Sequence, residues 1–206
     1  GDFIEIYCKA SLEICEKTLG LWHARTATVL NNIAVIHKRN GDFDPAETMF
    51  RRSLDINKKL FGLQNYRTAG SLNNLAALLK ARGNYAESED LFRKSLKITS
   101  DTLGLEHAIV SGRMSNLAKC LHDQGKYAAA RPLFEECLRI DEKVYGSSHP
   151  NVARSLGNLA GLLRDTGEES VALSMLKKSL AIRKDILGSE HPDVAISMEN
   201  LAASYL

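Results

Sequence analysis

The sequence lacks the features that mark membrane proteins and secreted disulfide-bonded proteins. No apolar run approaches the ~18 residues needed to span a bilayer, and the first residues show no basic segment followed by an apolar stretch. The four cysteines, Cys8, Cys15, Cys120 and Cys137, form no CxxC pair and no regular framework, so we expect them to be small buried hydrophobes. These absences favour a protein, or a fragment of one, that stays in water in the reducing cytoplasm.

Charge of one sign and catalytic motifs are also scarce. The net charge is +2 at pH 7, and there is no arginine-rich arm or basic stripe with interleaved aromatics, so nucleic acid is not an expected partner. No GxxxxGKS/T, GxGxxG, GxSxG or HExxH motif occurs. We therefore expect no enzymatic activity and no cofactor.

What the sequence does have is an internal repeat of 42 residues. A large residue followed by glycine recurs at Gly20, Gly62, Gly104, Gly146 and Gly188, and the phrases NNIA, NNLA, SNLA, GNLA and ENLA begin at residues 31, 73, 115, 157 and 199. A second series, Gly41, Gly83, Gly125 and Gly167, separates two stretches with apolar residues at i, i+3, i+4 and i+7, where a left-handed glycine ends a helix. Each unit is therefore predicted to be two helices joined by a turn.

This period sets the expected organisation of the chain. We predict full units at about residues 20–61, 62–103, 104–145 and 146–187, with a lone second helix at 3–19 and a lone first helix within 188–206. Neighbouring repeats share one core, so residues 1–206 are predicted to form a single domain. Both ends look cut from a longer array, and we expect a fragment of a longer protein whose uncapped end helices associate end to end.

The phrase LGxxHPxVAxSLxNLAxLLxxxGxYxxAxxLFxxSLxI, which residues 145–182 follow almost completely, resembles the tetratricopeptide repeat. More specifically, it is similar to the 42-residue variety of kinesin light chains and nephrocystin-like proteins, and the resemblance covers nearly the whole chain. It implies an all-α fold, a right-handed superhelical solenoid of stacked helix-turn-helix repeats. It also implies a role in binding other proteins.

One asparagine per repeat faces away from the predicted core. At ~100° per residue, the apolar positions around the asparagine of the NLA phrase lie on the far side of the helix. The resulting ladder on the concave groove lined by first helices consists of Asn32, Asn74, Asn116, Asn158 and Asn200. An amide supplies two donors and one acceptor, so the ladder suits the backbone of an extended peptide. The alternative is that each asparagine bonds a neighbouring helix and fixes the geometry between repeats.

The predicted groove is also basic. The first helices carry more Lys and Arg than Asp and Glu, whereas the second helices are balanced, so an acidic or C-terminally carboxylated peptide is the expected guest. Beside the ladder, the candidate contacts are Arg39, Arg113, Lys119 and Arg154. Cations nearer the helix C-termini, Lys38, Lys80, Arg82 and Arg164, are instead expected to favour the helix dipole. Glycines at 70, 112 and 161 indicate either room for a ligand or close helix contact.

The resemblance to kinesin light chains implies the same kind of guest. Their repeats bind short acidic peptides that carry tryptophan, through asparagines and basic residues of this face. The positions of this chain that match the asparagine pattern are Asn32, Asn74, Asn116 and Asn158.

Four histidines also recur with the period, each in a loop after the LG or YG glycine, at positions 23, 107, 149 and 191. Metal ligands converge within ~2 Å of one ion, whereas equivalent loops of packed repeats lie ~10 Å apart. We therefore predict a capping role for these histidines and no metal site. Trp22 lies in the first of these loops and is either a staple between repeats or an exposed contact.

Taken together, these patterns predict a scaffold or adaptor that holds an extended, acidic protein segment. The alternative is a regulatory or sensor arm of a larger signalling protein, such as a nucleotide-binding switch ATPase. Full-length sequence separates the two, because a phosphate-binding loop upstream would favour the second.

Overall fold

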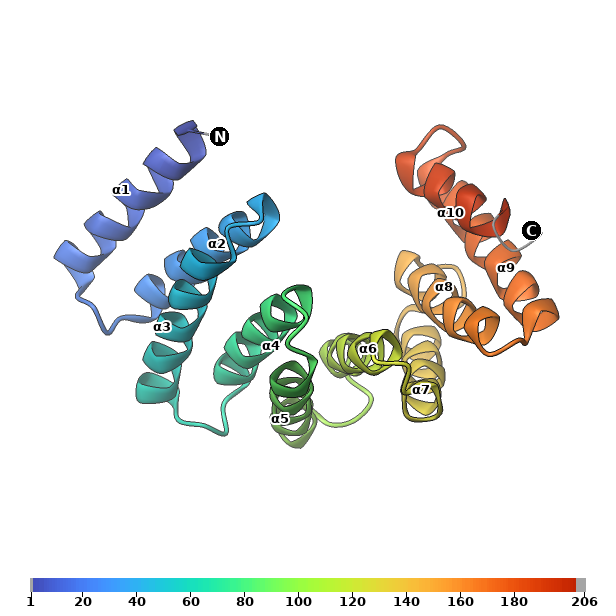
Figure 1. Ribbon diagram of the computed structural model, residues 1–206, viewed down its shortest axis with the longest axis horizontal. Helices are drawn as coiled ribbons and strands as arrows, with labels where there is room; N and C mark the ends of the chain where they lie inside the picture. The colour runs from blue at the N-terminus through green and yellow to red at the C-terminus, as the bar shows by residue number, and fades with distance from the viewer. Residues whose placement is uncertain (1, 203–206) are drawn as a thin grey trace. The chain divides into compact units, whose positions relative to one another are not determined.

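The computed structural model describes residues 2–202, with side chains from residue 6 onwards, and these residues form helices joined by short loops (Figure 1). The second helices of the repeats are α1 (Asp2–Leu19), α3 (Phe43–Phe61), α5 (Tyr85–Leu103), α7 (Tyr127–Tyr145) and α9 (Glu169–Leu187). The first helices are α2 (Ala24–Asn40), α4 (Tyr66–Ala81), α6 (Ala108–Asp123), α8 (Pro150–Asp165) and α10 (Pro192–Ala202). The predicted alternation of first and second helices is therefore confirmed.

The helices cluster into two compact units, Gly1–Thr102 and Leu103–Leu206. The division falls within one residue of a predicted repeat boundary, so each unit holds two whole repeats and one lone helix. That all repeats form a single domain stays a prediction. None of the helices described is long and apolar enough to cross a bilayer.

Residues local to each helix end explain why the helices start and stop where they do. Gly41 follows α2 with φ 88° and ψ 3°, the left-handed conformation that glycine adopts without a steric penalty. At the helix starts, Nδ1 of His23, His107, His149 and His191 accepts the backbone N–H two residues later at 3.1 Å. Asn65 makes the same contact through Oδ1 at 2.9 Å. The predicted capping role of the histidines is confirmed.

Each unit has its own apolar core between first and second helices. In the first unit Phe50 of α3 packs with Leu72, Leu75 and Leu79 of α4, and all four side chains are buried. In the second unit Leu156 of α8 packs with Ile182 of α9. These positions are the apolar stripes of the sequence, so hydrophobic burial selects the face that each helix turns inward.

A recurring polar contact joins each pair of helices inside this core. The hydroxyls of Ser53, Ser95 and Ser179 on second helices donate to backbone carbonyls of first helices at 2.8, 2.7 and 2.6 Å. In α7 the position is Cys137, whose Sγ donates to the Ser111 carbonyl oxygen at 3.2 Å. This contact could not be predicted from the sequence, because a serine inside an apolar stripe carries no signal of its partner.

The cysteines are free thiols, as no disulfide joins them. Cys15, Cys120 and Cys137 are buried, which confirms the expectation for these three, and Cys8 is half-buried. Burial raises the pKa of Cys137 to about 12, although its hydrogen bond to Ser111 opposes the shift. Its thiol therefore acts as a structural group rather than a nucleophile.

Candidate functional site

The predicted site residues all lie on first helices, but they differ in exposure. Asn32 and Arg39 of α2 are exposed, as is Arg154 of α8. The half-buried members are Asn74 of α4, Asn158 of α8, and Arg113, Asn116 and Lys119 of α6. Since half-buried polar groups are partly removed from water, the second set is better placed to bind a ligand strongly.

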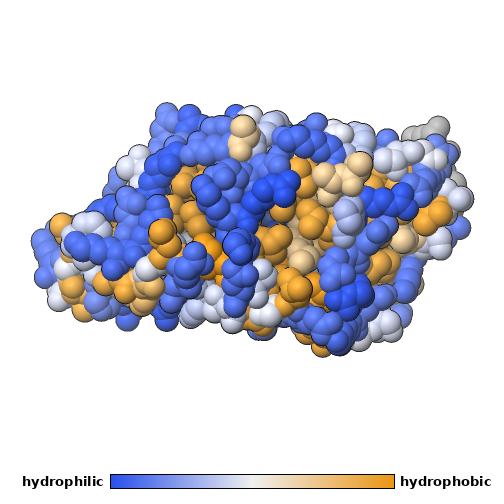
Figure 2. Space-filling view, turned by 90° about the horizontal axis from the view of Figure 1, so that it is seen from below, coloured by the Kyte–Doolittle hydropathy of each residue, from blue (hydrophilic) through white to orange (hydrophobic). Residues whose placement is uncertain are grey.

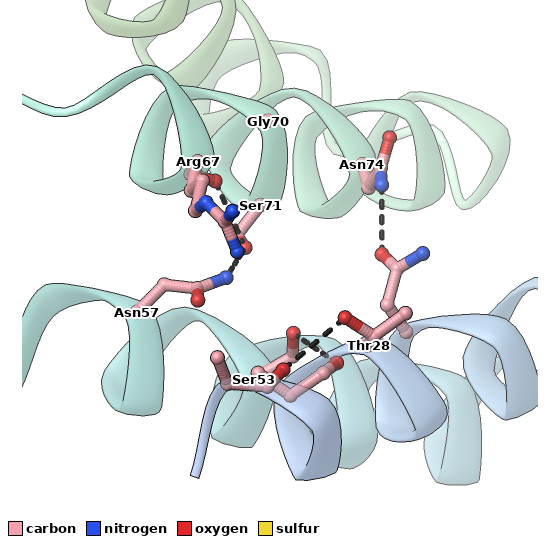
Figure 3. A pocket seen from close by; sticks show the side chains of 10 residues that line it. Thr28, Ser53, Asn57, Arg67, Gly70, Ser71 and Asn74 are labelled. Carbon is pink, nitrogen blue, oxygen red and sulfur yellow. Dashed lines mark hydrogen bonds between the residues drawn. The ribbon is translucent and has the colours of Figure 1, made fainter. Parts of the chain in front are cut away.

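Two ladder asparagines bond the preceding first helix. Nδ2 of Asn74 donates to Oδ1 of Asn31 at 2.7 Å, which joins α4 to α2 (Figure 3). Nδ2 of Asn158 donates to Oγ of Ser115 at 3.3 Å, which joins α8 to α6. At these positions the structural alternative therefore holds. An amide nitrogen carries two hydrogens, so one bond to a neighbouring helix leaves the other available to a ligand.

A small polar hollow of about 200 Å³ lies beside Asn74 in the first unit. Arg67, Gly70 and Asn74 of α4 lie on one side, and Thr28 of α2 lies on the other with Ser53 and Asn57 of α3 (Figure 3). Many of its polar groups already bond one another, as Asn57 does with Ser71 at 2.8 Å. The bond between Asn57 and Ser71 joins α3 to α4 beside the hollow.

A larger groove lies in the second unit and is here called the basic groove. It has a volume of about 400 Å³ and is lined by Ile109, Gly112, Arg113, Ser115, Asn116 and Lys119 of α6 and by Arg154 of α8. Four of the predicted contacts, Arg113, Asn116, Lys119 and Arg154, thus converge on one groove. None of these lining residues carries a carboxylate, so its potential is positive.

Arg113 is the most unusual member of the basic groove. Its Nε is buried and has no hydrogen-bond partner, and no nearby charge contributes to the shift of its pKa. Loss of hydration on burial lowers the pKa of Arg113 from its ordinary value. A desolvated cation without a counter-charge is stabilised strongly by an anion that enters beside it.

The acidic residues near the ends of the same two helices do not line the groove. Asp165 of α8 instead forms a hydrogen bond with His122 of α6, with Oδ2 of the aspartate 2.8 Å from Nε2 of the histidine. This contact joins α8 to α6. Neither Asp165 nor Asp123 lines the groove.

Two of the glycines in the first helices, Gly112 and Gly161, leave open space rather than close helix contacts. A Cβ built on Gly112 or on Gly161 meets no atom within 4 Å. The alternative of close packing is therefore wrong at these two positions. Gly112 lines the basic groove, where the absence of a side chain leaves room beside the cations.

Arg39 and Asn32 do not join the other predicted residues. Both are exposed on α2, and neither lines the basic groove or the hollow beside Asn74. Of the cations expected to serve helix ends, Arg82 forms ion pairs with Asp44 at 2.9 Å and Glu47 at 2.7 Å. Its charge is thus engaged within the first unit.

Known structures share the fold of this chain. The crystal structure of BtubC (BKLC) from P. vanneervenii aligns with a TM-score of 0.80 and 23% identity, over 96% of this chain and 78% of that one. A Podosopora anserina structure described as putative kinesin light chain nearly identical TPR-like repeats aligns with a TM-score of 0.76 and 26% identity, over 89% and 87%. A single-substitution variant of the same repeats gives 0.77 and 26%, over 89% and 86%. No curated protein matches the chain.

The repeats also match a family model directly. The model described as Tetratricopeptide repeat matches residues 2–59, 67–142 and 110–185, which together make up most of the chain. The predicted fold class, an all-α solenoid of stacked helix-turn-helix repeats, is confirmed. The chain therefore belongs to the tetratricopeptide repeat family.

Proposed function

We propose that this protein is an interaction scaffold that binds an extended acidic segment of a partner protein in the basic groove. The observation that carries the proposal is the buried, unpartnered Nε of Arg113, in a groove that also contains Lys119 and Arg154. Tetratricopeptide repeats support a general role in protein interaction, and the lining residues specify the chemistry of the guest.

Binding would bring a carboxylate of the partner to Arg113 and Arg154. The Arg113 guanidinium has already lost part of its hydration, so a carboxylate that reaches it gains a charge-assisted bond at low desolvation cost on the protein side. Gly112 leaves space for the backbone of the segment beside α6. Asn158 supports this arrangement because its bond to Ser115 holds α8 against α6, and it has a second N–H to offer the peptide.

Fluorescence anisotropy with labelled acidic peptides and their amidated or basic counterparts tests the proposal. Acidic peptides should bind the parent protein and release as salt is raised. Arg113→Met and Arg154→Gln should each weaken binding about tenfold or more, as the loss of one charged contact predicts. Arg164→Gln removes the same charge from an exposed site of α8 outside the groove and should leave affinity unchanged. Equal losses in all three variants would refute a role for the groove.

We also propose that the protein associates with itself through α1. Tyr7 and Ile14 are 72% and 61% exposed, whereas Ile56 and Ile140, which hold the repeat position of Ile14, are 1% and 0% exposed. An apolar face of this kind favours a protein contact. Light scattering should show a mass that rises with concentration in the parent and stays monomeric in Ile14→Ser. A concentration-independent monomer in the parent would refute the contact.

A further inference from the structure

A second hollow lies in the first unit, on the side formed by second helices. Its lining is more apolar than that of the basic groove. This Leu63 hollow has a volume of about 440 Å³ and lies between α3 and α5, under the loop that contains Leu63 and Gln64. Its apolar lining includes Leu54, Leu72 and Leu75, which are only 5%, 5% and 1% exposed, and Leu63 at 60% exposure. Figure 2 shows apolar residues that come to the surface between hydrophilic ones on one face of the protein.

Cations surround this apolar lining. Arg51, Lys58, Lys94 and Lys97 line the hollow, and no carboxylate does. Lys94 and Lys97 do pair with Asp90 and Asp101 at 2.6 and 3.1 Å along α5. Arg51 pairs with Glu47 and Glu87, and Lys58 with Asp55. Exposed pairs of this kind contribute little and are readily exchanged, so the cations remain available to an incoming acid.

The equivalent loop of the second unit shows which group such cations bind. One period after Leu63 and Gln64, the loop carries Leu105 and Glu106. Glu106 accepts a bond from Arg139 at 3.3 Å and another from Lys143, and these bonds lower the pKa of Glu106. Arg139 holds the repeat position of Lys97, whereas Lys143 holds that of Asp101, which pairs with Lys97 in the first unit. In the first unit the loop residue is the neutral Gln64, so the carboxylate that Glu106 supplies has no counterpart in that loop.

We propose that the Leu63 hollow is a second docking site, for an acidic partner segment that inserts an apolar side chain beside Leu63 and places a carboxylate against Lys97. The commitment to an acidic partner comes from the comparison with Glu106, and the commitment to an apolar anchor comes from the leucine lining. The site is separate from the basic groove, because the two lie in different units and share no lining residue.

The bound segment of the partner continues across α3 to a neighbouring hollow at Trp22. That hollow, of about 420 Å³, is lined by Leu21, Trp22, Arg51 and Ile56 among others, so Arg51 borders both. Trp22 is 50% exposed, and Nζ of Lys59 lies 3.8 Å from its ring centroid. Two apolar sites one repeat apart suit a linear segment with two anchors ~10 Å apart better than a small molecule. Trp22 thus contacts α3 through Lys59 and still presents half of its side chain to a partner.

Peptide selection from a random phage-displayed library tests the proposal and does not require the partner to be identified first. Binders are selected on the parent protein and depleted on Leu63→Asp. The expected survivors combine Asp or Glu with Leu, Ile or Phe. Their affinity, measured by anisotropy, should fall about tenfold or more in Leu63→Asp, as the lost burial of one leucine-sized contact predicts. Gln64→Glu should also weaken them severalfold, because the loop would then neutralise Lys97 itself.

Matched controls distinguish this site from the basic groove. Leu105→Asp changes an equally exposed leucine, at 62%, at the same repeat position in the second unit, and it should leave affinity unchanged. Arg113→Met should also have no effect on these peptides, so failure of the basic groove would not imitate failure here. The single tryptophan reports the second anchor directly, and its emission should shift when a peptide binds.

Several results would overturn the proposal. One is that no selected peptide binds more weakly to Leu63→Asp than to the parent, and another is that Leu105→Asp loses as much affinity as Leu63→Asp. A third is that the hollow binds palmitate, a small apolar acid, and no peptide. Peptides that depend on Leu63 but leave Trp22 emission unchanged would overturn the continuation across α3.

Discussion

Arg113→Met should make the protein more stable while it weakens the binding of acidic peptides. The buried Nε of Arg113 has no hydrogen-bond partner, and an orphaned buried donor costs about 1–3 kcal/mol. Methionine retains most of the apolar stem that packs against the groove and removes the orphan. Because the arginine is only half-buried, we take the low end of that range and expect a gain of about 1 kcal/mol in the free energy of unfolding. For a chain of this size that gain raises Tm by about 2–4 °C.

Urea denaturation followed by circular dichroism measures this effect as a higher midpoint at an unchanged m-value. Arg164→Met is the control, since Arg164 is exposed on α8 and its replacement should change stability by less than about 0.5 kcal/mol. A loss of about 1 kcal/mol or more in Arg113→Met would show that the guanidinium is already satisfied. The reasoning that makes Arg113 the anchor for an acidic guest would then be refuted.

Three further predictions concern single contacts. Asn74→Ala should lower the free energy of unfolding by about 1 kcal/mol, because it removes the bond to Asn31. Asn32→Ala, at an exposed ladder position, is the control and should change the free energy of unfolding by less than about 0.5 kcal/mol in the same urea titration. Gly112→Ala should raise the free energy of unfolding by about 1 kcal/mol through helix propensity, since a Cβ there meets no atom within 4 Å; a lower Tm would contradict this. The thiol of Cys137, whose pKa burial raises to about 12, should stay protonated at pH 8 and resist iodoacetamide until urea unfolds the protein, and mass spectrometry of the native protein would expose any early alkylation.

The features that could be predicted from the sequence are those encoded within one repeat. His107 accepts a hydrogen bond from the backbone N–H of Ile109, two residues away, so the cap depends on local geometry alone. Gly41 ends α2 for an equally local reason, because its positive φ suits no other residue as well. Apolar stripes at helical spacing then decide which face packs inward. These terms repeat every 42 residues, so the period was enough to predict the fold.

The candidate site was harder to predict because it depends on contacts between repeats. Arg39 and Arg113 have the same charge and both lie on first helices, yet Arg39 is exposed and Arg113 has a buried Nε. The sequence phase placed both on one face but could not show how far the neighbouring helix covers each side chain. Whether a ladder asparagine contacts a ligand or a neighbouring helix also depends on contacts between repeats. The partner of Asn74, for example, is a side chain 43 residues away.

Arg113 occupies a repeat position that elsewhere serves structure. Three of the four equivalent residues, Ser71, Ser155 and Ser197, are 6%, 2% and 4% exposed, and each hydroxyl bonds a polar side chain of the preceding second helix. The fourth is the apolar Val29. A serine is small enough to be satisfied inside the stack, whereas an arginine at that position extends its guanidinium into the groove and leaves Nε without a partner. A change that lowers local stability and creates a positive, partly dry surface is typical of binding sites, where optimal packing gives way to ligand contact. Comparison with the other repeats thus identifies Arg113 as a residue that favours binding over stability. For that reason we expect Arg113→Met both to gain stability and to lose affinity for acidic peptides.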